Sequence, residues 1–187
     1  VLSFVLLLGC GTKGVALEPV SNQLEVVVPA DGLTELDLKS GICVYQGQLG
    51  TPVRLLVSSP KMQLAAITII YDREKSLLTA NQQVELQAEE AGLQAVGEQM
   101  VITEELVKLP TGGKITSTTK DVSLVCTGVF QYQIPEETVQ TTGGFSLFHE
   151  DWILKGQQLE GNLPDGFFTA YGELSFEHPE LAGEAER

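Results

Sequence analysis

The chain has 187 residues, of which 43% are hydrophobic, 6% aromatic and 19% charged, and its formal net charge is −14. This length is enough for one domain with its own hydrophobic core. The negative charge disfavours nucleic acids and anionic membrane surfaces as partners, because both are bound through clusters of Lys and Arg. No internal run approaches the ~20 apolar residues that a membrane-spanning helix needs.

The first ten residues, VLSFVLLLGC, have the character of the end of an export signal. Leu7-Leu8-Gly9-Cys10 resembles a bacterial lipoprotein box, in which the cysteine thiol carries the lipid. Cys10 is therefore the predicted lipidation site of an anchor at 1–10, and an uncleaved membrane anchor is the alternative. Either interpretation predicts that the rest of the chain lies outside the cytoplasm, after a polar tether at 11–22.

Beyond the tether, apolar and polar residues alternate with the period of β-strands. The predicted strands are 24–28, 33–38, 41–45, 53–57, 64–71, 84–88, 93–96, 122–134, 144–148 and 167–176. Turn signals separate them at 72–76, 89–92, 110–113, 141–144, 149–151 and 163–166. This pattern predicts an all-β domain over 23–178, either a sandwich, a jellyroll or an open barrel, followed by a polar tail at 179–187.

Residues 122–134 are expected to form the longest strand, because every even position from Val122 to Ile134 is apolar or Gly. Such a strand has a fixed inner and outer face, which specifies its register. The final predicted strand, 167–176, alternates in the same way.

An internal repeat relates the two halves of the domain. Tyr71 aligns with Tyr132, and the same offset of 61 residues is expected to hold without a gap. The further matched pairs are Val84 with Phe145, Leu86 with Leu147, Glu89 with Glu150, Leu93 with Leu154, Val107 with Phe168 and Ile115 with Phe176. The repeat indicates stacked strand–turn–strand units.

The sequence contains no motif of a known catalytic or metal centre, and we predict a protein that is not an enzyme and has no cofactor. His149, Glu150 and Asp151 cannot converge as neighbours, because consecutive strand residues point to opposite faces. A metal site formed by His149 with Asp151 is the alternative. Cys43 and Cys126 lie in apolar runs, where they are either a disulfide or two buried thiols.

Residues 67–105, ITIIYDREKSLLTANQQVELQAEEAGLQAVGEQMVITEE, resemble the repeat of the OstA/LptA/LptC family of lipopolysaccharide-transport proteins. The similarity lies in the order of Tyr71-Asp72, a charged turn, Val84-Glu85-Leu86 and Leu93-Gln94-Ala95. Residues 129–161 look like a second copy of this unit. The resemblance implies an antiparallel β-jellyroll, a twisted open sandwich, that holds acyl chains in an apolar groove.

By strand parity, the repeat and this resemblance, eleven residues are expected to line the groove. They are Ile67, Ile69, Tyr71, Val84, Leu86, Phe130, Tyr132, Phe145, Leu147, Phe168 and Leu174. Parity alone leaves open whether such residues line a groove or fill a packed core.

The implied function is that of a periplasmic, membrane-anchored carrier, with the inner membrane as the expected membrane. Its implied partners are lipopolysaccharide, the membrane subunits of an ABC exporter, and an LptA-like bridge protein that pairs with the sheet edges. The alternatives are a surface lipoprotein that binds carbohydrate or a protein through loops such as 110–113 and 163–166, and a structural envelope protein.

Overall fold

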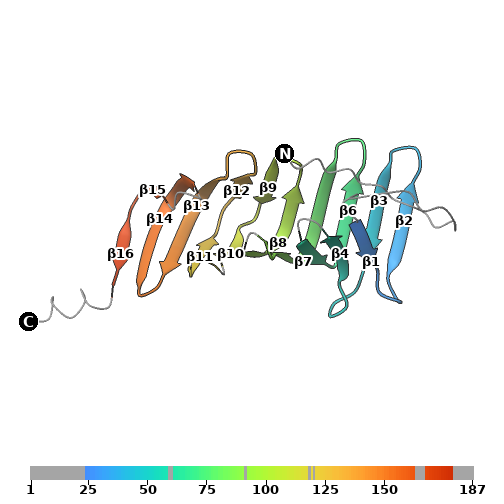
Figure 1. The fold of residues 1–187 in the computed structure, drawn as a ribbon, viewed down its shortest axis with the longest axis horizontal. Helices are drawn as coiled ribbons and strands as arrows, with labels where there is room; N and C mark the ends of the chain where they lie inside the picture. Colours follow the sequence, from blue (N-terminus) through green and yellow to red (C-terminus); the bar gives the residue numbers. More distant parts are fainter. Residues whose placement is uncertain are drawn as a thin grey trace, which may run out of the picture.

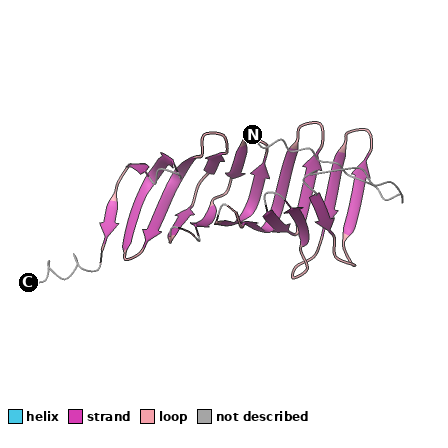
Figure 2. Ribbon diagram, in the orientation of Figure 1, coloured by secondary structure: helices cyan, strands magenta, loops and turns pink. Residues whose placement is uncertain are grey.

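The computed structural model describes residues 24–58, 61–90, 92–117, 119, 121–162 and 167–178. These residues form sixteen strands in one antiparallel sheet, and none of them forms a helix (Figure 2). The predicted anchor at 1–10, the tether at 11–22, the turn at 163–166 and the tail at 179–187 lie outside the described residues.

The sheet folds over itself into two layers, because four long strands run through both of them (Figure 1). These strands are β7 (Leu77–Ala88), β8 (Leu93–Ile102), β13 (Thr138–His149) and β14 (Trp152–Asn162). One half of each strand pairs within the first layer and the other half within the second. The fold is an antiparallel β-jellyroll, as predicted.

Layer A contains, in spatial order, β2 (Leu33–Asp37), β3 (Ile42–Gln46), β6 (Thr68–Asp72), β7, β8, β9 (Leu106–Leu109), β12 (Phe130–Gln133), β13, β14 and β15 (Phe167–Tyr171). Layer B contains β1 (Leu24–Val27), β4 (Val53–Ser58), β5 (Lys61–Ala66), β7, β8, β10 (Gly113–Ser117), β11 (Val122–Cys126), β13, β14 and β16 (Ser175–Glu177). The molecule is therefore elongated, with β1 and β2 at one end and β15 and β16 at the other (Figure 1).

The long strands change layer at two equivalent corners. Gln82 and Gln83 in β7 have positive φ, and so do Gly143 and Gly144 in β13, where the pairing register shifts. Consecutive residues in the left-handed region turn a strand sharply, which is most favourable for glycine. The sequence predicted that residues 141–144 separate two strands, and this is wrong. The chain bends there, but it continues within the single strand β13.

Three strands predicted as continuous are interrupted at the edge between the layers. Residues 122–134 form β11 and β12, residues 64–71 fall into β5 and β6, and residues 167–176 into β15 and β16. Each break moves the chain from one layer to the other. Alternation does not reveal the first break, because the even positions face inward on both sides of it.

Gly128 lies at the break between β11 and β12 and touches the corner of β13. A Cβ atom at this position would lie 1.9 Å from the Thr142 carbonyl oxygen. We therefore expect Gly128→Ala to lower the free energy of unfolding in urea by about 1–3 kcal/mol, as for other overpacked sites. Glu136→Ala, at an exposed position in the next turn, should change it by less than about 0.5 kcal/mol. Equal unfolding midpoints for the two variants would show that the backbone at this corner shifts to make room for the added methyl group.

The register confirms the internal repeat but not its uniform offset. Strands β7 and β13 correspond at 61 residues, including their bulges. The next hairpins differ, because Ala88 pairs with Leu93 across residues 89–92, whereas His149 pairs with Trp152 across two residues only. Leu93 therefore corresponds to Trp152, and the expected match with Leu154 is wrong.

Candidate functional site

The inner faces of the two layers enclose one continuous apolar core. Successive strand residues point to opposite faces, so each strand contributes alternate side chains to this interior. The buried hydrophobic residues extend from Cys43 and Tyr45 in β3 to Leu159 in β14, and Trp152, Leu154, Phe168 and Ala170 pack against them near the far end.

The structure places most of the predicted groove residues on these inner faces. Buried in the core are Ile69, Tyr71, Val84, Leu86, Phe130, Phe145 and Leu147, whereas Tyr132 and Phe168 are half-buried against it. Ile67 lies half-buried at the break between β5 and β6. Leu174 lies between β15 and β16, is 53% exposed, and covers Gly156 of β14.

Several interior residues were missed by the sequence prediction. Met100, Leu109 and Leu159 are completely buried, yet they belong to strand segments that had not been assigned. The repeat carried the missing signal: Met100 and Leu159 occupy corresponding places in β8 and β14, opposite Ala80 and Thr141.

The interior contains little polar chemistry. Thr141 is its one fully buried polar residue among those described, and its hydroxyl oxygen accepts a hydrogen bond of 3.1 Å from the Leu159 amide. The interior therefore offers mainly apolar contact, and the Thr141 hydroxyl is already paired.

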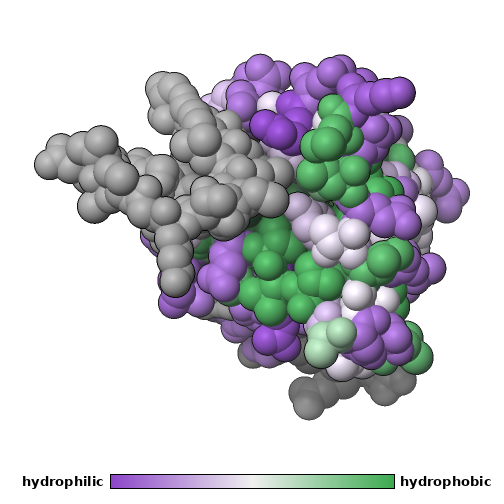
Figure 3. Space-filling view, turned by 90° about the vertical axis from the view of Figure 1, so that its right-hand side faces the viewer, coloured by the Kyte–Doolittle hydropathy of each residue, from purple (hydrophilic) through white to green (hydrophobic). Residues whose placement is uncertain are grey.

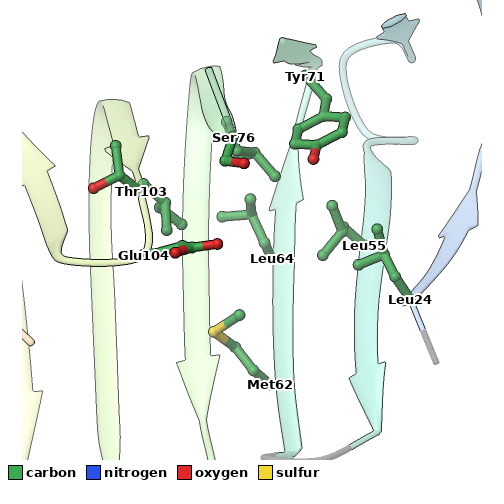
Figure 4. A pocket seen from close by; sticks show the side chains of 10 residues that line it. Leu24, Leu55, Met62, Leu64, Tyr71, Ser76, Thr103 and Glu104 are labelled. Atoms are coloured by element: carbon green, nitrogen blue, oxygen red, sulfur yellow. The ribbon is translucent and has the colours of Figure 1, made fainter. Parts of the chain in front are cut away.

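A small cavity lies between the layers near the β1 and β2 end (Figure 4). Layer B contributes Leu24, Leu55, Met62 and Leu64 to it, and layer A and its turns contribute Tyr71, Ser76, Leu78, Ile102, Thr103 and Glu104. Its volume of about 40 Å³ leaves room for no more than a few water molecules. An acyl chain could therefore enter this cavity only if the two layers move apart here.

Tyr71 and Glu104 are the two ionisable residues that border this cavity. Figure 4 shows the Tyr71 hydroxyl and the Glu104 carboxylate directed toward the apolar side chains. Burial raises the pKa of the Tyr71 phenol, Arg73 opposes the rise, and Glu104 adds to it. Tyr71 therefore remains neutral at physiological pH and can donate a hydrogen bond at the rim of an otherwise apolar space.

Asp72 fixes the turn beside this cavity. Its carboxylate accepts hydrogen bonds from the Glu74 and Lys75 amides, and Lys75 Nζ lies 2.8 Å from its Oδ2 atom. The hydrogen bond from the Lys75 side chain is the main reason that the pKa of Asp72 lies below the usual aspartate value.

A carboxyl group whose pKa is lower in the folded state stabilises the fold above its unfolded pKa and loses this effect as the pH falls. We therefore expect Asp72→Asn to have a lower Tm than the wild type at pH 7. The difference should shrink as the pH falls below about 4, where aspartate becomes protonated in the unfolded chain. Thermal unfolding at several pH values tests this, and a constant difference would exclude the carboxylate charge as the cause.

Both ends of the molecule combine unpaired strand edges with exposed apolar side chains. Among the described strands, β1 and β2 each pair on one side only, and β15 and β16 pair only with β14. Exposed at the first end are Val27, Leu33, Leu36 and Leu38, and at the second Phe167, Tyr171, Leu174 and Phe176. Figure 3 shows the first end, where hydrophobic surface lies between polar margins. Such edges are suited to pairing with further strands.

An aromatic group occupies the second end of layer B. The rings of His149 and Trp152 are 5.3 Å apart, and those of Trp152 and Phe176 are 5.9 Å apart. His149 Nδ1 and Ser123 Oγ are buried there without a hydrogen-bond partner. His149 thus belongs to an aromatic group, and it is not part of a cluster of three potential metal ligands, since the described residues contain none.

Cys43 and Cys126 are separate buried thiols, in layer A and layer B respectively. Burial raises the pKa of the Cys126 thiol, which disfavours the reactive thiolate.

No helix that could cross a membrane occurs in the described part of the chain.

No protein-family model matches this chain, and no curated protein matches it. Among solved structures, it is similar to the crystal structure of LptH, the LptA homologous periplasmic component of the lipopolysaccharide transport device from Pseudomonas aeruginosa. The two chains share 12% identity, with a TM-score of 0.33, over 83% of this chain and 94% of LptH. The functional proposal therefore rests on the structure of this chain itself.

Proposed function

We propose that this protein is a non-enzymatic periplasmic carrier that binds the acyl chains of lipopolysaccharide and passes them from an inner-membrane exporter toward the outer membrane. The observation that carries the proposal is the continuous apolar interior, which extends between two sheet layers and ends at unpaired edges.

The chemistry of the interior favours acyl chains over polar ligands. Burial of each methylene group contributes about 0.8 kcal/mol without requiring a specific hydrogen bond. A polar ligand would instead lose its hydration, and the interior offers it few partners. An even apolar lining also allows a chain to slide, because no single position holds it much more tightly than the next.

The small volume of the cavity near the β1 and β2 end implies that binding of an acyl chain there is coupled to separation of the two layers. The cavity beside Ile102 and Leu78 is the place where an acyl chain would first separate the layers, since the side chains already leave a gap there. The phosphorylated head group would remain outside, because a protein with a net charge of −14 does not attract it into the fold.

The sheet edges would connect the carrier to its partners. In this proposal β1 and β2 pair with the exporter, and β15 and β16 pair with an LptA-like bridge protein, by strand addition. The apolar interiors of successive proteins would then form one path. The predicted lipid or membrane anchor before the tether would hold the chain at the inner membrane.

Native mass spectrometry of the full chain, expressed in a periplasm that contains lipopolysaccharide, tests the function. A co-purified mass of lipid A or lipopolysaccharide is the expected result. Protein without lipid, which also fails to bind added lipopolysaccharide, would contradict the proposal and identify the interior as a filled structural core.

A further inference from the structure

The outer surface of layer A carries a second, polar concavity, which shares only the edge strand β15 with the surfaces used in the proposed carrier function. It lies over β12, β13, β14 and β15 and has a volume of about 560 Å³. Its side chains point away from the apolar interior, because they alternate with the buried residues Phe130, Val139 and Leu159. The two sites thus occupy opposite faces of the same strands.

Amide and hydroxyl groups form a row across this concavity. The strand register places Gln131 opposite Gln140, Gln140 opposite Glu160, and Glu160 opposite Thr169. Neighbouring strands lie about 4.8 Å apart, so the row offers polar groups at regular intervals. Gln140 Nε2 donates a hydrogen bond of 2.8 Å to Glu160 Oε1, which fixes the centre of the row.

The first repeat shows that the fold does not require these polar residues. The corresponding row there consists of Ile70, Thr79, Val101 and Lys108, which are cross-strand neighbours in the same order. Ile70 thus takes the place of Gln131, and Val101 that of Glu160. The same backbone is built with apolar side chains at these positions, so the amides are available for a role other than folding.

An aromatic ring completes the site. Phe167 faces outward beside the row, opposite Asn162, and is 71% exposed. Aromatic side chains contribute large contact areas at binding surfaces. Its flat face can stack on the apolar face of a sugar ring while amides and hydroxyls bond to the sugar hydroxyl groups.

We propose that this concavity, formed around Gln131, Gln140 and Phe167, binds a neutral oligosaccharide. Each amide supplies one acceptor and two donors, which matches hydroxyl groups that both donate and accept. Glu160 and the overall negative charge disfavour an anionic ligand. A cation would find one carboxylate, which already accepts a hydrogen bond from Gln140. The inference goes beyond the carrier function and does not depend on it.

The test uses the full chain and a glycan array that holds neutral oligosaccharides of glucose, galactose, mannose and N-acetylglucosamine beside anionic, sialylated and sulfated ones. The best binder is then titrated in two-dimensional 1H–15N NMR, where the side-chain amide signals of Gln131 and Gln140 should shift. The double variant Gln131→Ala/Gln140→Ala should bind about thirtyfold more weakly, since each of the two lost hydrogen bonds contributes about 1 kcal/mol. Phe167→Ala should weaken binding to a similar degree.

Thr79→Ala is the matched control, because Thr79 occupies the place of Gln140 in the first repeat; it should bind like the wild type. Binding confined to anionic glycans, no binding on the array, or full affinity in the double variant would each overturn the assignment. Ile102→Asp, a change inside the lipid cavity, should leave glycan binding intact, so failure of one site is distinguishable from failure of the other.

Discussion

Replacement of Ile102 by aspartate should abolish the binding of lipopolysaccharide acyl chains. Ile102 is half-buried at the end of β8 and lines the cavity between the layers. A carboxylate there would have to lose its hydration when an acyl chain enters, which costs several kcal/mol without a partner. Native mass spectrometry or displacement of a fluorescent fatty-acid probe would measure the loss.

Val101→Asp is the matched control for this variant. Val101 precedes Ile102 on the same strand but faces outward, opposite Lys108, where a carboxylate meets a positive charge. This variant should bind lipid like the wild type, and circular dichroism should show β-structure for both. Leu24→Asp, which alters the cavity from the edge strand of layer B, provides an independent second variant. Undiminished binding by both folded cavity variants would refute the assignment of this interior as the lipid site.

The largest effect on stability is expected for Leu159→Ala. Leu159 is completely buried on β14, and truncation of a buried leucine removes transfer free energy and leaves a cavity. The free energy of unfolding should fall by about 2–5 kcal/mol, measured by urea denaturation. The smaller residue also leaves the Thr141 hydroxyl bonded to the same backbone amide, so the loss reports packing alone.

Gln158→Ala is the control on the same strand, because its side chain is exposed. It should change the unfolding free energy by less than about 0.5 kcal/mol. If Leu159→Ala lowered the free energy of unfolding as little as Gln158→Ala, the side chains near β14 would have to move into the space left by the leucine. The packing there would then be less rigid than we expect.

The alternation of side chains could be predicted from the sequence because it is a local property of strands. Residues such as Ile69, Val84 and Phe145 face inward as their spacing required, and Tyr71 and Tyr132 occupy equivalent places. Two-residue periodicity decides the face of each side chain regardless of which strand lies next to it.

The strand ends, in contrast, were decided by tertiary contacts. The breaks at Ile67, Gly128 and Gly172 occur where the chain passes from one layer to the other. At Gly128 and Gly172 the even positions stay on the inner face, so alternation does not register the crossing. At Ile67 the inner face changes from even to odd positions. The shift of β14 relative to β8 followed from a shorter hairpin at Glu150 and Asp151. An alignment by one uniform offset could not detect it.

The sequence by itself therefore determined an acidic, all-β chain with a repeated pattern and one apolar face on each strand. Only the tertiary structure decided which faces meet, where the strands change layer, and that a cavity of about 40 Å³ is left between Leu24, Leu64 and Ile102. The physical reason is that the face to which a side chain points is set by its position within its own strand. The distance between the two layers is set by packing between residues that are far apart in the sequence.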